Sequence, residues 1–142
     1  LFLLGVLIFI AGYFIIQTSE VIAEKTGITK KIIDFIADPD IMKIGVALDD
    51  DFHQLRKQAD IEPQNIIDLN KLAPKLGVEK IGVRNLSAIF LNGRVSKNQQ
   101  TSNWENSSLT DAQLNYAATD AWVCLKIYER MAELGMLGNN RL

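Results

Sequence analysis

The chain has 142 residues, of which 48% are hydrophobic, so its length suits one domain and its composition excludes a wholly disordered protein. Its formal net charge of −2 at pH 7 argues against a large basic surface for nucleic acid, but not against an enzyme whose bound metal ions meet a phosphate. Cys124 is the single cysteine, which excludes a disulfide framework and a cysteine zinc site. We therefore expect a reducing, cytoplasmic location.

Residues 1–16 form an uncharged apolar run that allows three interpretations. The β-branched and aromatic content of the run favours two buried strands that turn near Ala11 and Gly12. A membrane helix normally needs about 20 apolar residues, and it would make the protein membrane-associated. A signal-type segment or a misread sequence is the third interpretation. We treat residues 1–25 as an apolar N-terminal segment and residues 26–142 as one domain.

Downstream of this segment, strand-like and helix-like runs alternate. Apolar residues at helical spacing predict a helix over residues 26–37, which Asp38 and Pro39 end. Strands are predicted over 41–48 and 65–69, helices over 52–59, 69–76 and 85–91, and a polar loop over 94–108. The alternation predicts an α/β domain with a mixed sheet flanked by helices.

The last helix has the clearest signal in the chain. Thr110 and Gln113 form a capping-box pattern, which predicts a helix that starts there and runs to about residue 133. One face of this helix is predicted to be buried: Leu114, Ala117, Ala118, Ala121, Leu125 and Tyr128.

Tyr116 and Asp120 lie one turn apart on the same helix, on a different face that also carries Gln113 and Val123. A carboxylate and a phenol placed in this way can hold a metal ion and orient a water molecule, although the spacing also arises by chance. Asp51 directly follows a predicted strand, a common place for metal chemistry in α/β sheets. The alternative for Asp51 is an N-cap of a helix that starts at Phe52.

Several stretches resemble, in their content and order, the DEDDy-type 3′→5′ exonuclease family, which includes ribonuclease D. The stretch IGVALDDDFHQLRK carries the glycine, aspartate, aromatic residue and leucine of the family's second motif, at Gly45, Asp51, Phe52 and Leu55. IIDL and SNW follow, and LTDAQLNYAATDAWVCLKIY has the Tyr-Ala-Ala-x-Asp-Ala pattern of the third motif, from Tyr116. The resemblance covers about residues 32–134.

The resemblance implies a ribonuclease-H-like fold and a two-metal mechanism, in which four carboxylates hold two Mg²⁺ or Mn²⁺ ions. Asp51 and Asp120 then match two of the metal ligands, and Tyr116 matches the phenol that orients the attacking water. The implied substrate is a DNA or RNA 3′ end. His53 does not match the histidine of the sister DEDDh group, and we expect it to be a surface residue.

One departure from the family is serious. The family's first motif, Asp-x-Glu on the first strand, supplies the other two carboxylates, and no Asp-x-Glu occurs in residues 1–50. We therefore expect the first strand to be missing and the chain as given to have little or no activity. Two alternatives remain: a non-catalytic remnant that binds nucleic acid or a partner protein, and an exonuclease-like domain anchored to a membrane by residues 1–16.

The polar loop and its neighbours offer candidates for nucleic-acid contacts. Arg94, Lys97 and Lys80 are candidates to meet phosphates, with solvated surface charge as the alternative. Trp104 is a candidate to stack on a base, with an anchor for the loop as the alternative. Cys124 is expected to be a buried packing residue.

Overall fold

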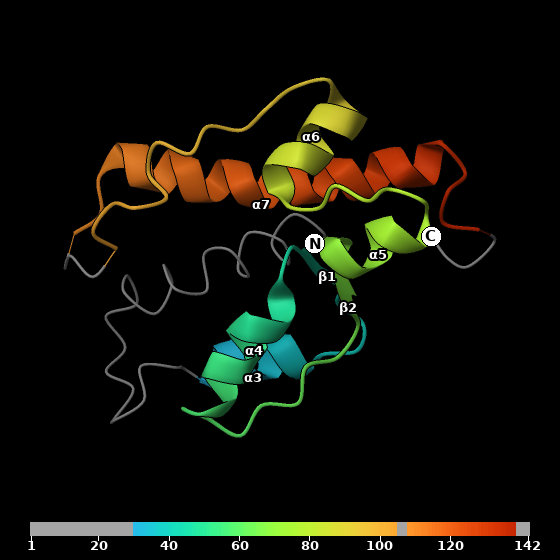
Figure 1. Cartoon of the computed structure of the whole chain (residues 1–142). Coiled ribbons are helices and arrows are strands. Elements are labelled where there is room, and N and C mark those ends of the chain that lie inside the picture. The colour runs from blue at the N-terminus through green and yellow to red at the C-terminus, as the bar shows by residue number, and fades with distance from the viewer. Residues whose placement is uncertain (1–29, 105–107, 139–142) are drawn as a thin grey trace.

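The computed structural model describes residues 30–104 and 108–138, and their main chain forms an α/β arrangement (Figure 1). The elements follow in the order α3 (Lys30–Ala37), β1 (Lys43–Gly45), α4 (Leu48–Arg56), β2 (Ile66–Asp68), α5 (Leu69–Lys75), α6 (Val83–Leu91) and α7 (Asp111–Glu133). The α/β class expected from the sequence is confirmed. The N-terminal segment, with its strand, membrane-helix and signal-type interpretations, lies outside the described residues.

A two-stranded parallel sheet occupies the middle of the described structure. Lys43 pairs with Ile66, and Gly45 pairs with Asp68, so the carboxyl ends of both strands lie together. The crossover between the strands contains α4. Figure 1 shows the sheet between two groups of helices, α6 and α7 on one side and α3 and α4 on the other.

Two hydrophobic cores flank this sheet. The larger core lies where α6 and α7 pack against β1 and α5, and its fully buried members include Ile44, Leu69, Leu86, Ile127 and Met131. The smaller core joins α3 to α4 through Ile32, Ile36, Leu48, Phe52 and Ile61. Because the two cores lie on opposite sides of the sheet, β1 is buried throughout and β2 is partly buried between them.

The boundary between β1 and α4 corrects the prediction made from the sequence. The strand expected to reach Leu48 ends at Gly45, and the helix expected to start at Phe52 starts at Leu48. Ala47 has the left-handed backbone conformation (φ 58°), which turns the chain sharply after the strand. Leu48 then folds back over Gly45, where an added Cβ would lie 2.5 Å from the Leu48 Cδ2 atom. An apolar run therefore contains a strand end, a turn and a helix start.

Helix α7 begins with the predicted capping box. The Thr110 hydroxyl accepts from the Gln113 amide at 3.3 Å, and the Thr110 amide donates to the Gln113 Oε1 atom at 2.9 Å. Ala117, Ala121, Leu125 and Tyr128 are buried, as expected.

The predicted buried face of α7 is wrong at three other positions. Ala118 is exposed, whereas Gln113 and Val123 are buried. The buried stripe runs through Gln113, Ala117, Ala121 and Cys124, at helical spacing, and Ala118 lies to one side of it.

Most remaining predictions agree closely with the structure, although α4 ends at Arg56 rather than at residue 59. Helix α3 is the described part of the first predicted helix. Helices α5 and α6 correspond to the two short predicted helices, and their ends differ from the prediction by one or two residues. Asn92 closes α6 in the left-handed conformation. The described part of residues 94–108 contains neither helix nor strand. Across residues 30–104 and 108–138, no helix is long and apolar enough to cross a membrane.

Candidate active site

Tyr116 and Asp120 form a pair on the first half of α7. Both side chains are half-buried, and the Tyr116 hydroxyl and the Asp120 carboxylate share a hydrogen bond. Burial raises the pKa of Asp120 to about 6, against the lowering effect of that hydrogen bond. Burial and the negative charge of Asp120 raise the pKa of Tyr116. The phenol therefore stays protonated at neutral pH and can donate a hydrogen bond.

The polar loop packs against this pair through Trp104. The Trp104 and Tyr116 ring centroids lie 6.0 Å apart with an interplanar angle of 49°. The indole Nε1–H of Trp104 donates to the Gln99 carbonyl at 3.0 Å. Trp104 therefore anchors the loop beside Tyr116, and its role in stacking on a base stays a prediction.

Gln113 fastens the same loop to α7. Its amide Nε2 donates to the Ser102 hydroxyl at 3.1 Å and to the Asn103 carbonyl at 3.0 Å. The side chain is 3% exposed, and the capping box with Thr110 uses its oxygen. This one residue therefore fixes both the start of the helix and the loop that faces Tyr116. The sequence signalled the cap but not the contacts with the loop.

An open hollow of about 270 Å³ lies between the loop and α7. Tyr116 and Asp120 lie in its wall together with small and amide-bearing residues: Val95, Ser96, Asn98, Gln99, Ala112, Asn115 and Thr119. Arg94 and Lys97 are exposed and adjoin these wall residues in the sequence. The candidate catalytic pair is therefore accessible to a ligand from the side of the loop.

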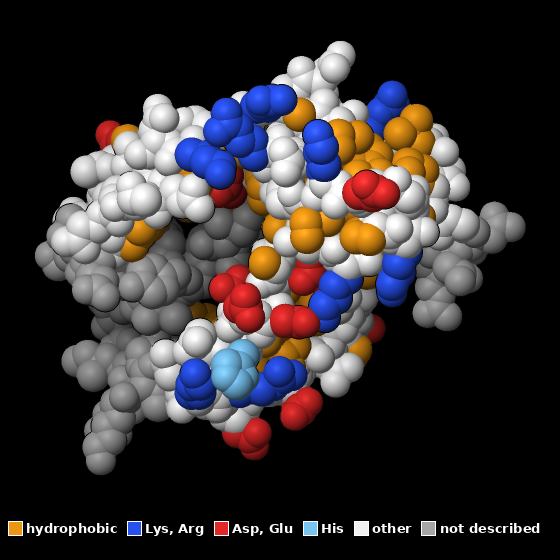
Figure 2. All heavy atoms as spheres, in the orientation of Figure 1, with side chains coloured by type: hydrophobic (Ala, Val, Ile, Leu, Met, Phe, Trp, Pro, Cys, Tyr) orange, Lys and Arg blue, Asp and Glu red, His pale blue; other side chains and the backbone are white. Residues whose placement is uncertain are grey.

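Asp51 lies inside the first turn of α4, and its side chain is exposed. Although the residue is exposed, nearby protein atoms partly desolvate its carboxylate and raise its pKa, and the negative charges of Asp50 and Asp68 add to this rise. The alternative of an N-cap for a helix starting at Phe52 is wrong, because Ala47 occupies the cap position. His53 is exposed on the same helix, as expected (Figure 2).

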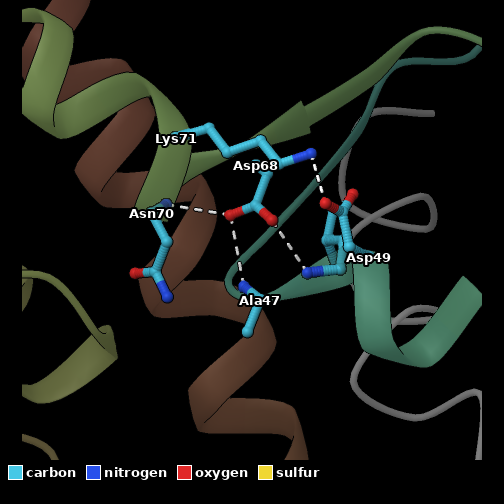
Figure 3. A network of polar contacts seen from close by, with 6 residues as sticks. Ala47, Asp49, Asp68, Asn70 and Lys71 are labelled. Atoms are coloured by element: carbon cyan, nitrogen blue, oxygen red, sulfur yellow. Dashed lines mark hydrogen bonds and ion pairs between the residues drawn. The ribbon is translucent and has the colours of Figure 1, made fainter.

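Asp68 is the functional candidate that the sequence reasoning missed. It is 8% exposed at the end of β2, and its carboxylate accepts from the backbone amides of Ala47 at 3.2 Å, Leu48 at 2.9 Å and Asn70 at 2.9 Å (Figure 3). It thus caps α4 and α5 together. An aspartate directly before a predicted helix signals a cap of α5, but nothing in the sequence signals its contact with α4.

A second, larger hollow of about 660 Å³ lies beside this junction, between α4 and α5. Its wall carries His53 and charged side chains of both signs: Asp49, Asp50, Asp68, Arg56, Lys71 and Lys75. Lys71 forms an ion pair with Asp49 at 2.5 Å, which joins the two helices at the surface. Figure 2 shows acidic side chains gathered at the centre of this face, with basic ones around them.

The positions of α4 and α7 decide how close the carboxylates of Asp51 and Asp120 can lie. Figure 1 shows α4 and α7 on opposite faces of the sheet, so the two carboxylates can approach one another only beyond the strand ends. Asp68 lies at these ends. Desolvation is the main cause of the raised pKa of Asp51 and of Cys124, and the negative charge of Asp68 adds to both rises, as the charge of Asp120 does for Cys124. Among the described residues, no three His, Cys, Asp or Glu side chains are grouped so as to hold a metal ion. The shared metal site stays a prediction.

One Asp-x-Glu triplet does occur later in the chain, at Asp60-Ile61-Glu62. It lies after Asp51 rather than before it, in a segment that belongs to no helix or strand. Asp60 and Glu62 are exposed, whereas Ile61 is buried in the smaller core. The triplet therefore does not match the position of the family's first motif.

Comparison with known proteins decides the family. The family model described as 3′–5′ exonuclease matches residues 8–135 of this chain. The chain belongs to the 3′–5′ exonuclease family. Ribonuclease D of Haemophilus influenzae is 31% identical over 97 residues, which cover 68% of this chain and 24% of that protein. The bifunctional 3′–5′ exonuclease/ATP-dependent helicase WRN of Mus musculus is 33% identical over 99 residues, which cover 67% of this chain and 7% of that protein.

The fold is likewise that of solved exonuclease domains. The exonuclease domain of Aedes aegypti Nibbler matches with a TM-score of 0.64 and 23% identity, over 72% of this chain and 57% of that one. The expected ribonuclease-H-like fold and membership of an exonuclease family are thus confirmed. This exonuclease chain spans less than a quarter of the length of the curated relatives named here.

Proposed function

We propose that this domain, when it carries a complete site, hydrolyses phosphodiester bonds at the 3′ ends of DNA or RNA. The hydrogen-bonded Tyr116–Asp120 pair carries the proposal, because it lies half-buried in an open hollow and has the family's third-motif pattern. Family membership supports the reaction class.

The donors present suit a divalent cation in kind. Asp51 and Asp120 offer the hard oxygen ligands that Mg²⁺ and Mn²⁺ prefer. Both carboxylates have raised pKa values, since reduced hydration penalises their negative charge, and a nearby cation would offset that penalty. Bound ions would supply positive charge at the reacting phosphate and favour ionisation of a water molecule. We propose Asp51 and Asp120 as the ligands of this chain, with a second ion requiring further carboxylates.

The other residues take roles that their positions allow. The protonated Tyr116 hydroxyl would hold the attacking water by a hydrogen bond, with the ring braced by Trp104. Arg94 and Lys97 would contact phosphates along the mouth of the hollow, and the accessible part of Trp104 would stack on a base. The cytoplasmic location expected from the sequence stays part of this proposal.

A second candidate function is binding without catalysis, to nucleic acid or to a protein. The described residues contain no group of three potential metal ligands, which favours this candidate for the chain by itself. The membrane-anchored alternative depends on residues 1–16, which lie outside the described residues.

Degradation of 3′-labelled and 5′-labelled DNA and RNA oligonucleotides in Mn²⁺ tests the proposal. We expect the 142-residue chain to be inactive, because it lacks the first-motif carboxylates. A version extended at its N-terminus by a strand carrying Asp-x-Glu should remove nucleotides from the 3′ end, and Asp120→Ala should abolish this activity.

Two outcomes would contradict these expectations. Robust degradation by the chain as given, lost in Asp120→Ala, would show that the first motif is dispensable here. No activity from a folded, extended version would favour binding without catalysis.

A further inference from the structure

The junction of β1, α4, β2 and α5 depends on one buried carboxylate. Figure 3 shows Asp68 between the start of α4 and the start of α5, with its oxygens directed at the backbone amides of both. Its Oδ1 atom accepts from Ala47 and Asn70, and its Oδ2 atom accepts from Leu48. Three of the roughly four acceptor positions of the carboxylate are therefore used by structural hydrogen bonds, which leaves Asp68 little capacity to bind a metal ion.

Helix α4 needs this distant cap. The first amides of a helix have no partner within the helix, and a side chain at the cap position usually supplies one. Ala47 occupies that position in α4 and makes no side-chain capping bond. Asp68 supplies the missing acceptor from 20 positions along the chain. The start of α4, which the sequence alone placed wrongly, is thus fixed by a residue of β2.

Asp51 lies four residues after the cap position, Ala47, and belongs to the first turn of α4. If the first amides lost their acceptor, that turn would fray or start later, and the direction of the Asp51 carboxylate would change with it. We propose that Asp68 is a positioning residue for the exonuclease site, acting by fixing the first turn of α4 and hence the Asp51 carboxylate. This inference rests on the proposed role of Asp51 in metal binding.

Two substitutions separate this role from general stability. Asp68→Ser keeps a short side chain that can cap Asn70 and α5 but cannot reach the amides of Ala47 and Leu48. Asp68→Asn keeps one acceptor oxygen and places an amide donor where the other oxygen was. Asp49→Asn is the matched control: it removes the same charge from the same junction and breaks the pair with Lys71, but leaves the cap of α4 intact.

The experiment uses the 142-residue chain and Mn²⁺ alone as the probe. Paramagnetic broadening of backbone amide resonances around Asp51 and Asp120 reports the manganese concentration at which the site fills. Asp51→Asn and Asp120→Asn should each raise this concentration. We expect Asp68→Ser to raise it about tenfold, as loss of a residue that orients a metal ligand commonly does. Asp68→Asn should have a smaller effect, and Asp49→Asn should stay within about twofold of the parent.

Each outcome decides the question. Unchanged resonances of α5 and of the second half of α7 would show that a variant is folded, and if Asp68→Ser does not fold, Asp68→Asn carries the comparison. Broadening in a folded Asp68 variant equal to that of the parent would overturn the inference while leaving the metal site in place. Broadening that is indifferent to Asp51→Asn and Asp120→Asn would remove the proposed metal site itself, and the positioning role with it.

Discussion

The ionised form of Asp120 destabilises the folded chain, because its carboxylate is partly buried. Burial raises its pKa from 3.8 to about 6, so the folded chain binds a proton more tightly at this residue than the unfolded chain does. Between these two values, stability therefore falls as the pH rises. Above about pH 6 the full penalty applies, and below about pH 4 both states are protonated and the penalty is gone.

We expect Asp120→Asn, in metal-free buffer, to be more stable than the parent at about pH 7.5 by on the order of 1 kcal/mol. The difference should disappear at about pH 4. Urea unfolding of both proteins at the two pH values, with a chelator present, measures it. An equal difference at both pH values, or a less stable variant at the higher one, would contradict the raised pKa.

Tyr116 is expected to act through its hydroxyl rather than its ring. In an N-terminally extended, active version of the domain, Tyr116→Phe keeps the ring contact with Trp104 and removes only the hydroxyl, which we propose holds the attacking water. We predict that kcat falls by about 10²–10⁴ while KM stays near that of the parent, because the bond is made mainly in the transition state.

The matched control is Tyr116→Ala, which should also lower the melting temperature because the ring contact is lost. Steady-state kinetics together with thermal melts separate catalysis from packing. A parental kcat for the Phe variant would remove Tyr116 from the mechanism.

At the scale of elements, the tight passage from β1 to α4 depends on the absence of a side chain at Gly45. Leu48, 1% exposed, fills the space that a Cβ there would need, at 2.5 Å from its Cδ2 atom. We predict that Gly45→Ala lowers the free energy of unfolding by about 1–3 kcal/mol, as overpacking of a well-filled core commonly does.

Gly93→Ala is the control for that substitution. A Cβ at Gly93 would meet nothing closer than 3.9 Å, on an exposed residue. Its effect should stay within about 0.5 kcal/mol. Chemical unfolding of both variants gives the comparison, and a Gly45→Ala variant as stable as the parent would show that Leu48 moves aside freely.

At the scale of the whole molecule, Lys43 and Cys124 show how completely the sheet region is enclosed. Lys43 is buried in β1, and its amine donates to the carbonyls of Asp38 and Gln64, tying the end of α3 to the segment before β2. Cys124 is 0% exposed in the larger core, and burial raises the pKa of its thiol to about 12, with the charges of Asp120 and Asp68 adding to the effect.

Cys124 therefore reports the opening of the fold. A thiol reagent reacts with the thiolate, which requires both exposure and deprotonation. Because the chain has one cysteine, we expect labelling at about pH 8 to be about a thousandfold or more slower in the native protein than in denaturant. The absorbance of the coloured group that the thiol reagent releases measures the labelling rate of the native protein and of the denatured protein. Rapid, complete labelling under native conditions would contradict a closed core around α7.

Features encoded within a few neighbouring residues could be predicted from the sequence. The capping box of Thr110 and Gln113, the left-handed end of α6 at Asn92 and the turn spacing of Tyr116 and Asp120 all depend on local backbone geometry. The ordered motifs around Asp51 and Tyr116 predicted the family, which the comparisons confirmed.

Features that join distant segments could not be predicted. A largely apolar run such as Met42 to Leu48 is compatible with a strand and with a helix start, and the Asp68 carboxylate of a later strand fixes the boundary. The burial of Gln113 and the contact of Trp104 with Tyr116 likewise depend on where the loop folds back. A buried acceptor stabilises the backbone amides that the fold places next to it. Packing across the sheet determines which amides these are, and the neighbouring residues in the sequence do not.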